Sequence, residues 1–173
     1  IEYKHISKIV GKSNLIFTNI KNPRDVSKLI NFGVVKIDSV IKLRLENACL
    51  LDPKAKKTLK PNEKFDYLIF GGILGDFPEQ GRTEKLLTSK LKNVEVRNLG
   101  KKQMSTDTAV LVTKLIVKGT RIEKIKFVDN PSIVIKKGKF QEEINLPYRY
   151  ISKNNKPMIS KELTEYLKEK KSI

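Results

Sequence analysis

The sequence predicts an α/β domain built on a mostly parallel sheet with helices on both faces. Three observations lead to this prediction. Segments with helical spacing alternate with short apolar runs through most of the chain. Those runs are apolar at consecutive positions, as expected for strands that helices cover on both sides. With 173 residues, 39% of them hydrophobic, and no low-complexity tract, residues 1–173 are predicted to form a single domain with a sizeable core.

Local signals define the elements of the first third. Gly11 ends an amphipathic helix, and the predicted strand NLIFTNI follows it. A second helix begins at Asn22 and Pro23, residue types that favour a helix start, and it ends at Gly33. Asp38 is the predicted cap of a short third helix. In chain order, these four elements cover residues 1–11, 14–20, 22–33 and 38–47.

The middle of the chain alternates apolar strands with unusual loops. The run ACLLD is predicted to be a buried strand that ends at Pro53, and a basic connector (PKAKKTLKPNEK) leads from it to the strand KFDYLIF. A glycine-rich loop, a helix and the strand VEVRNL follow. The three strands cover residues 48–52, 64–70 and 94–99, the connector covers residues 53–64, and the helix covers residues 82–91.

The last third begins with the most apolar helix of the chain. Ser105 or Thr106 is its predicted cap, and the helix dipole favours Asp107 in its first turn. Capping alone explains this pattern, although a ligand-facing turn just before the helix fits it as well. An extended segment, a hairpin that turns at KKGK and a helix capped by Ser160 complete the chain. These elements cover residues 105–119, 125–129, 132–146 and 160–171.

The charge leaves the class of partner open. The net charge is +17, which is typical of proteins that bind nucleic acids. However, the basic residues are spread along the whole chain, and only six of the 36 are arginine, the residue that forks onto phosphates. A basic surface also suits a protein that works on ribosomes.

Single residues exclude several other classes. Cys49 is the only cysteine, which excludes an internal disulfide and fits a reducing cytoplasm; it is predicted to lie in the core. His5 is the only histidine, so no histidine-based triad can form, and no metal-ligand spacing is present. No apolar run approaches the roughly 20 residues that span a bilayer. Metal-free group transfer away from membranes is therefore favoured over hydrolysis.

The loop FGGILGDFPEQGRT, residues 70–83, is the most unusual segment. The spacing of Gly71, Gly72 and Gly75 does not match a dinucleotide fingerprint, and no Gly-Lys-Ser/Thr of a P-loop follows. Such glycines permit a tight corner or bring main-chain amides close to a ligand. NLGKKQM follows another strand, and ligands bind beyond the carboxyl ends of such strands. The two loops are therefore predicted to wall one pocket.

The same glycine-rich loop carries a local negative charge. Asp76, Glu79 and Arg82 give it a net charge of −1 within a chain of +17. A loop of this kind faces a cation, or it is solvated and contains an internal ion pair. Composition does not decide between these two interpretations.

Several motifs in fixed order resemble one branch of the SPOUT-class methyltransferases. They are IEYKHI, LLDPKA, FGGILGDFPEQGRTEKL, VRNLGKKQMSTDTAVLVTKLIV, VDNPSI and INLPYRYI, and together they cover nearly the whole chain. The branch includes a protein-arginine methyltransferase that acts on a ribosomal protein, and archaeal members labelled as RNA methyltransferases. Since the branch normally begins with another strand before IEYKHI, and the chain starts without methionine, we expect an N-terminal strand to be missing here.

The resemblance implies a trefoil knot in the C-terminal part of the sheet, a rare feature among folds. It also implies that S-adenosylmethionine is held largely by main-chain groups of three loops. The residues expected to bind this cofactor are Gly71, Gly72, Ile73, Leu74, Gly75, Leu99, Gly100, Gln103, Met104, Thr106, Val128 and Pro131.

Methyl transfer from a sulfonium is an in-line displacement, so the protein mainly positions the nucleophile. A guanidinium nucleophile starts protonated, with a pKa above ~12, and a pair of carboxylates is the expected device to orient it. Asp76, Glu79 and Asp107 are the predicted catalytic acids, with Asp76 first. Arg82 is expected to brace the loop or to hold an acidic or phosphate group of the substrate.

Three functions are consistent with the sequence. The first is a cytoplasmic protein-arginine methyltransferase acting on a ribosomal protein. The alternative is a methyltransferase of ribosomal or transfer RNA, with stacking by Tyr148, Arg149 and Tyr150 and a steep salt dependence. The third is a non-catalytic module that binds ribosomal RNA. The sequence leaves open whether the protein is a monomer or a homodimer.

Overall fold

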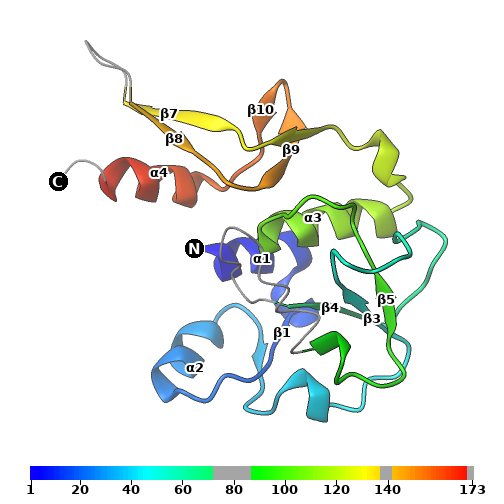
Figure 1. The fold of residues 1–173 in the computed structure, drawn as a ribbon. Coiled ribbons are helices and arrows are strands. Elements are labelled where there is room, and N and C mark those ends of the chain that lie inside the picture. Colours follow the sequence, from blue (N-terminus) through cyan, green and yellow to red (C-terminus); the bar gives the residue numbers. More distant parts are fainter. Residues whose placement is uncertain (72–86, 137–141, 171–173) are drawn as a thin grey trace.

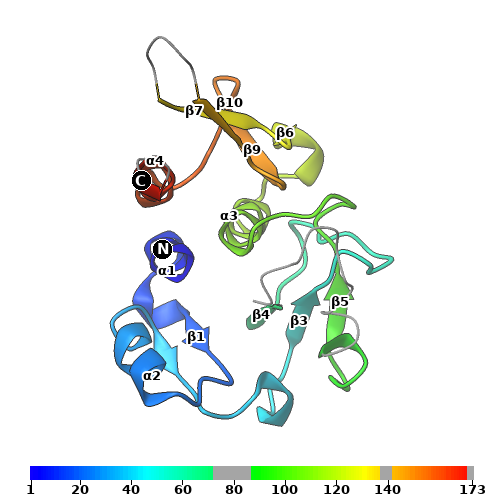
Figure 2. The ribbon, with the colours of Figure 1, turned by 60° about the vertical axis from the view of Figure 1, so that its left-hand side comes forward.

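The computed structural model describes residues 1–71, 87–136 and 142–170. One part holds the first helices and the parallel strands, and a second part holds antiparallel strands and the C-terminal helix, with α3 between them (Figures 1 and 2). The described α-helices are α1 (Glu2–Val10), α2 (Pro23–Leu29), α3 (Thr106–Val117) and α4 (Lys161–Lys170). Single 3₁₀ turns are η1 (Lys12–Asn14), η2 (Val40–Lys42) and η4 (Ile122–Lys124).

A three-stranded parallel sheet forms the centre of the first part. It consists of β3 (Ala48–Leu51), β4 (Tyr67–Phe70) and β5 (Glu95–Arg97), in the order β4-β3-β5. Leu51 lies opposite both Phe70 and Arg97, so the three carboxyl ends meet at one edge. All four residues of β3 are buried, as its continuous apolar run predicts.

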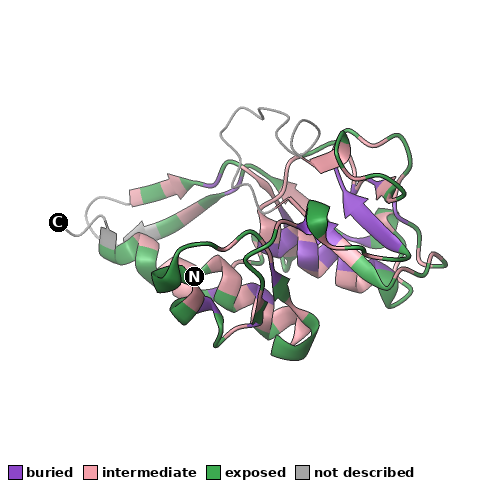
Figure 3. Cartoon of the chain, turned by 90° about the horizontal axis from the view of Figure 1, so that it is seen from below, coloured by how far each residue is buried: buried purple, intermediate pink, exposed green. Residues whose placement is uncertain are grey.

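Alternate residues of β3 serve two separate hydrophobic clusters. Cys49 packs in the cluster that contains the fully buried Val112 and Ile116 of α3. Leu50 packs on the other side of the strand, with Val40 of η2. Because successive side chains of a strand point to opposite faces, the sheet is covered on both sides. The buried residues gather around this sheet and α3 (Figure 3).

A short parallel pair, β1 (Ile16–Phe17) and β2 (Val34–Val35), lies beside this sheet. β1 confirms the predicted strand in shortened form, whereas β2 was not predicted. The turn into β2 depends on Gly33, because a Cβ atom there would lie 2.7 Å from the carbonyl oxygen of Leu15. A glycine that only ends a helix and one that also permits this close approach look the same in the sequence.

The predicted helix over residues 38–47 is wrong. Only the single turn η2 forms, and its cap is Ser39 rather than Asp38, because the Ser39 hydroxyl accepts the N–H of Ile41 at 3.4 Å. Leu43 is already extended, with φ −80° and ψ 124°. The chain must extend here to enter β3, and this demand outweighs the helical spacing of its apolar residues.

The second part of the molecule is antiparallel. β6 (Phe127–Asp129), β9 (Arg149–Lys153) and β10 (Lys156–Pro157) form a sheet in the order β10-β9-β6. The predicted hairpin is confirmed as β7 (Ser132–Lys136) and β8 (Glu142–Asn145), while residues 137–141 of its turn lie outside the described residues. The α/β class is confirmed, but parallel pairing holds only for the described strands up to β5.

The helices predicted at residues 1–11, 22–33 and 160–171 are confirmed as α1, α2 and α4. Asn22 caps α2 by accepting the N–H of Arg24 at 2.9 Å, and Ser160 caps α4 by accepting the N–H of Leu163 at 3.1 Å. Of the helix predicted at residues 82–91, only its end is described, where the N–H of Leu91 donates to Leu87 at 2.8 Å. No helix in the described ranges is long and apolar enough to cross a membrane.

Candidate active site

The candidate site begins at the edge where the parallel strands end. Gly71 directly follows β4, and Asn98 and Leu99 follow β5, with β3 between the two strands. Because neighbouring strands lie about 4.8 Å apart, the two loops start about 10 Å from each other. The two loops that the sequence predicts to wall one pocket therefore start at the same edge.

Asn98 shapes the loop after β5. Its Oδ1 atom accepts the N–H of Gly100 at 2.9 Å and the hydroxyl of Thr58 at 3.0 Å, and its Nδ2 group donates to the carbonyl of Ala55 at 2.7 Å. Gly100 has φ +93°, a conformation that side chains disfavour. Sequence reasoning missed Asn98, although an asparagine just before a Leu-Gly pair at a strand end is a turn signal.

The end of this loop pairs with the start of β9. The N–H of Arg149 donates to the carbonyl of Gln103 at 2.9 Å, and Met104 forms a parallel bridge with Arg149. Met104 also packs against the cluster that contains the buried Leu99. The predicted cofactor residues of this loop therefore form one ordered unit with β9.

The third predicted cofactor segment lies on the other side of β9. Val128 pairs with Tyr150, and the N–H of Asn130 donates to the carbonyl of Tyr148 at 3.1 Å. Pro131 is buried, and its carbonyl accepts the N–H of Leu146 at 2.9 Å. The structure thus brings residues 99–104 and 128–131 together through β9.

The first turn of α3 is capped from a distant part of the chain. Ser105 is the N-cap residue, but its side chain makes no capping hydrogen bond. Instead, the Oε1 atom of Glu2 accepts the N–H of Thr106 at 2.8 Å and that of Asp107 at 3.3 Å. Burial and the nearby charge of Asp107 raise the pKa of Glu2. Ser105 is therefore confirmed as the N-cap residue and Asp107 lies in the first turn, but the side chain that accepts the end amides is that of Glu2.

Asp107, a predicted catalytic acid, is buried among internal partners. Its Oδ1 atom accepts the hydroxyl of Ser105 at 2.7 Å and the N–H of Thr108 at 2.9 Å. Its Oδ2 atom lies 2.7 Å from Nδ1 of His5. His5 is therefore the partner of a buried carboxylate, which the sequence did not indicate. Both oxygens of Asp107 organise the start of α3 directly after the candidate cofactor loop.

Seven predicted site residues lie outside the described residues, in the segment between Gly71 and Leu87. They are Gly72, Ile73, Leu74, Gly75, Asp76, Glu79 and Arg82. The residues considered for RNA stacking are described, and they do not form an open platform. Tyr150 is 4% exposed, burial raises its pKa, and Arg149 is paired with Asp129.

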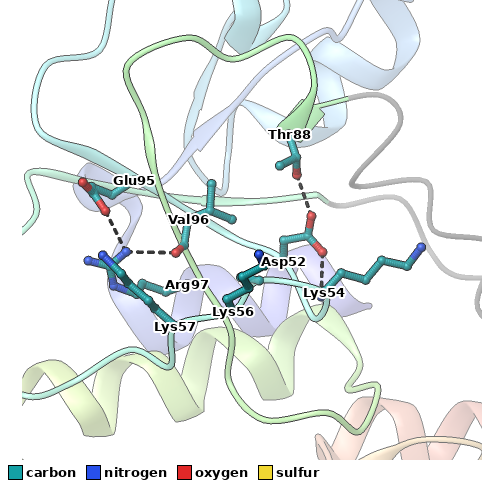
Figure 4. A pocket seen from close by; sticks show the side chains of 9 residues that line it. Asp52, Lys54, Lys56, Lys57, Thr88, Glu95, Val96 and Arg97 are labelled. Carbon is teal, nitrogen blue, oxygen red and sulfur yellow. Dashed lines mark hydrogen bonds and ion pairs between the residues drawn. The ribbon is translucent and has the colours of Figure 1, made fainter.

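A cavity of about 330 Å³ opens at the same edge of the sheet (Figure 4). Asp52 lines it and accepts both the hydroxyl of Thr88 at 2.6 Å and the N–H of Lys54 at 2.9 Å. The residues that line this cavity are Asp52, Lys54, Ala55, Lys56, Lys57, Thr88, Glu95, Val96 and Arg97. The cavity therefore joins the basic connector to the end of β5, which sequence reasoning did not predict.

The buried Arg97, which lines this cavity, forms an ion cluster with the half-buried Glu63 and the exposed Glu95. Its guanidinium lies 2.6 Å from Glu63 and 2.7 Å from Glu95, and it lies over the ring of Phe65 at 5.8 Å. The hydrogen bonds to Glu63 raise the pKa of Arg97 and lower the pKa of Glu63. Within residues 1–71, 87–136 and 142–170, no group of three or more His, Cys, Asp or Glu side chains is arranged to hold a metal ion.

Comparisons with known proteins give the family. Residues 1–172 match the model of a family described as protein arginine N-methyltransferase SFM1-like. The chain belongs to this family. It is 35% identical over 187 residues to protein arginine N-methyltransferase SFM1 of Saccharomyces cerevisiae, covering 97% of this chain and 86% of the yeast protein.

Solved structures of the yeast enzyme have the same fold. The crystal structure of yeast arginine methyltransferase SFM1 complexed with SAM matches with a TM-score of 0.85 and 35% identity, covering 99% of this chain and 84% of that one. The complex with SAH matches with a TM-score of 0.83 and 34% identity, covering 96% and 86%. These matches to the SFM1-like family confirm the prediction of an S-adenosylmethionine-dependent protein arginine methyltransferase.

The described residues of the candidate site fit this cofactor. S-adenosylmethionine carries an adenine ring that apolar surroundings suit. Leu99 and Met104 of the loop after β5 and Val128 of β6 are apolar, although Leu99 and Met104 pack in the core cluster. Around Gly100, the only described atom within 4 Å of an added Cβ is Nη1 of Arg149, at 3.8 Å. A side chain at position 100 would thus meet few described atoms, but the positive φ of Gly100 disfavours one.

Proposed function

We propose that this chain methylates an arginine of a ribosomal protein in the cytoplasm, with S-adenosylmethionine held by the loops after β4 and β5 and by residues 128–131. One observation carries the location of the site. Residues 99–104 and residues 128–131, two of the three predicted cofactor segments, lie on either side of β9. The remaining segment, which begins at Gly71, starts at the same sheet edge as residues 99–104. The net charge of +17 suits work on the ribosome, whose RNA is anionic.

The fold proposed for this site is the SPOUT fold with a trefoil knot. Residues 103–104 and β6 both pair with the first residue of β9, Arg149, although Met104 and Asp129 are far apart in the sequence. This arrangement, in which a late strand lies between two earlier segments, supports a threaded connection.

The residues of the chain have separate tasks in this proposal. When bound, S-adenosylmethionine supplies an electrophilic methyl group on its sulfonium centre. Asp76 and Glu79 orient the substrate guanidinium through charge-assisted hydrogen bonds. Because the guanidinium is cationic before and after methylation, one proton is released, and a carboxylate at this place can accept it. Asp107 with His5 holds the start of α3 in position beside the cofactor loop.

The test is transfer of a labelled methyl group to ribosomes and to free ribosomal components, followed by separate nuclease and protease digestion. We expect label that survives nuclease, disappears with protease and is recovered as methylarginine after hydrolysis. Asp76→Asn should lower the incorporation at least about 100-fold, since the acid acts on the reacting group, whereas Glu123→Gln, an exposed acid of η4, should leave it unchanged. Label lost with the RNA would contradict the proposed substrate.

A further inference from the structure

The main chain of Arg149 lies where two candidate cofactor segments meet. Its N–H donates to the carbonyl of Gln103 at 2.9 Å, and the residue forms a parallel bridge with Met104. It also pairs with Asp129 of β6, in antiparallel register. Arg149 is thus the residue of β9 at which residues 99–104 and residues 128–131 are joined.

The side chain of Arg149 binds β6 and extends toward the turn at Gly100. Its Nε and Nη2 groups donate to Oδ1 and Oδ2 of Asp129, at 2.6 Å and 2.9 Å, and its guanidinium lies over the ring of Phe127 at 5.0 Å. The remaining nitrogen, Nη1, lies 3.8 Å from where a Cβ atom of Gly100 would be. The guanidinium therefore lies between β6 and the turn of the loop after β5.

The geometry of this pair differs from that of an ordinary surface ion pair. A bidentate pair between a guanidinium and a carboxylate fixes the orientation of both planes, which a lysine cannot do. The side chain of Arg149 is 23% exposed, and stacking on Phe127 restricts it further. The hydrogen bonds from Arg149 lower the pKa of Asp129, and the positive charge of Lys102 in the neighbouring loop acts in the same direction.

We propose that Arg149, clamped by Asp129 and Phe127, is a positioning residue that holds the two candidate cofactor loops at a fixed separation. This inference rests on the proposed location of the cofactor. The loops contact the ligand and Arg149 sets their spacing, so its loss should weaken cofactor binding more than it weakens the fold. Main-chain pairing of β9 with both loops remains in a side-chain variant, which is why the fold is expected to survive.

The test compares Arg149→Met with Arg121→Met, a matched change of an exposed arginine outside these loops. Calorimetric titration with S-adenosylhomocysteine measures affinity, and thermal unfolding without ligand measures stability. We expect Arg149→Met to bind roughly tenfold to a hundredfold more weakly, as displaced loops lose contacts to the ligand, with a nearly unchanged melting temperature. Arg121→Met should match the wild type in both measurements.

Two further variants keep the inference open to contradiction if Arg149→Met does not fold. Asp129→Asn should reproduce the loss of affinity, and Arg149→Lys should recover only part of it, because a lysine keeps the charge without the bidentate geometry. With each variant, KM for S-adenosylmethionine should rise while kcat at saturating cofactor stays near the wild-type value.

Two negative results would distinguish an error in the positioning role of Arg149 from an error in the proposed cofactor site. Wild-type affinity for S-adenosylhomocysteine in Arg149→Met or Asp129→Asn, with a lowered melting temperature, would make the pair a purely structural one and overturn the inference. A wild-type protein that does not bind S-adenosylhomocysteine at all would contradict the proposed cofactor site itself, and the positioning role with it.

Discussion

Two regions of the molecule differ in how deeply their side chains are buried: the parallel sheet with α3, and the C-terminal hairpin with α4. Leu50 of β3 and both Val112 and Ile116 of α3 are fully buried. In contrast, the side chains that the structure describes in β7, β8 and α4 are half-buried or exposed (Figure 3). α4 contacts α1 through ion pairs of Glu162 with Lys8 and Lys4.

This difference matters for the site because the site uses both parts. The loops after β4 and β5 start on the sheet with the buried core, whereas β6 and β9 belong to the antiparallel part. Apolar burial dominates stability, while exposed ion pairs contribute little. The sheet should therefore act as the rigid support. β9 is anchored in the same core through Ile151, so within the C-terminal part it is β7, β8 and α4 that should open more easily.

The largest effect is expected from shortening a leucine in each part. Leu50→Ala removes fully buried methyl groups and leaves a cavity, which should cost about 2–5 kcal/mol of the free energy of unfolding. Leu167→Ala in α4 removes a half-buried side chain and should cost about 1 kcal/mol. Chemical denaturation of both variants measures the difference, and equal losses would contradict the contrast between the two parts.

The ion cluster at the end of β5 should come next in magnitude. Glu63→Gln leaves the largely buried Arg97 with one charged partner instead of two, which should cost about 1–3 kcal/mol. Glu46→Gln changes an exposed acid and is the matched control. The denaturation midpoints of the two variants measure how much the ion pair of Glu63 with Arg97 stabilises the fold. Indistinguishable midpoints would show that the cluster adds no stability to the sheet.

The dependence of stability on pH should separate Glu63 from Glu2. The pKa of Glu63 is lowered from its ordinary 4.5 by Arg97, so its contribution is complete above pH 4.5 and is lost as pH falls through the lowered value. The pKa of Glu2 is raised, so its ionisation acts in the opposite direction and lowers stability as pH rises through that value.

We therefore expect the melting temperature of the wild type to fall as the pH drops below 4.5, and to fall less steeply in Glu63→Gln. Thermal scans at several pH values measure this. A Glu63→Gln curve parallel to that of the wild type would mean that other carboxylates carry the acid sensitivity.

The smallest effect is expected at the contact between α1 and α4. Lys8→Ala breaks an exposed ion pair with Glu162, so the midpoint of global unfolding should stay within experimental error. Hydrogen exchange of the α4 amides should nevertheless become faster, because this contact restrains a helix with little buried surface. Slower or unchanged exchange in α4 would show that other contacts hold this helix.

The sequence by itself determined the elements whose signals are local. Asn22 with Pro23 and Ser160 begin α2 and α4 as predicted, because a cap bonds to an amide two or three residues away. The apolar run of β3 likewise shows its burial directly. The motifs also gave the family and the cofactor, since their order along the chain is specific.

Only the tertiary structure decided which distant groups meet. Glu2 caps α3 from 104 residues away, Arg149 of β9 binds Asp129 of β6, and His5 pairs with Asp107. None of these pairs follows from spacing, because each depends on how the strands and helices pack. Residues 99–104 and 128–131 lie on the two sides of β9, and their binding of the cofactor stays a prediction. The position of β9 between those two segments depends on long-range strand pairing, which the sequence pattern does not reveal.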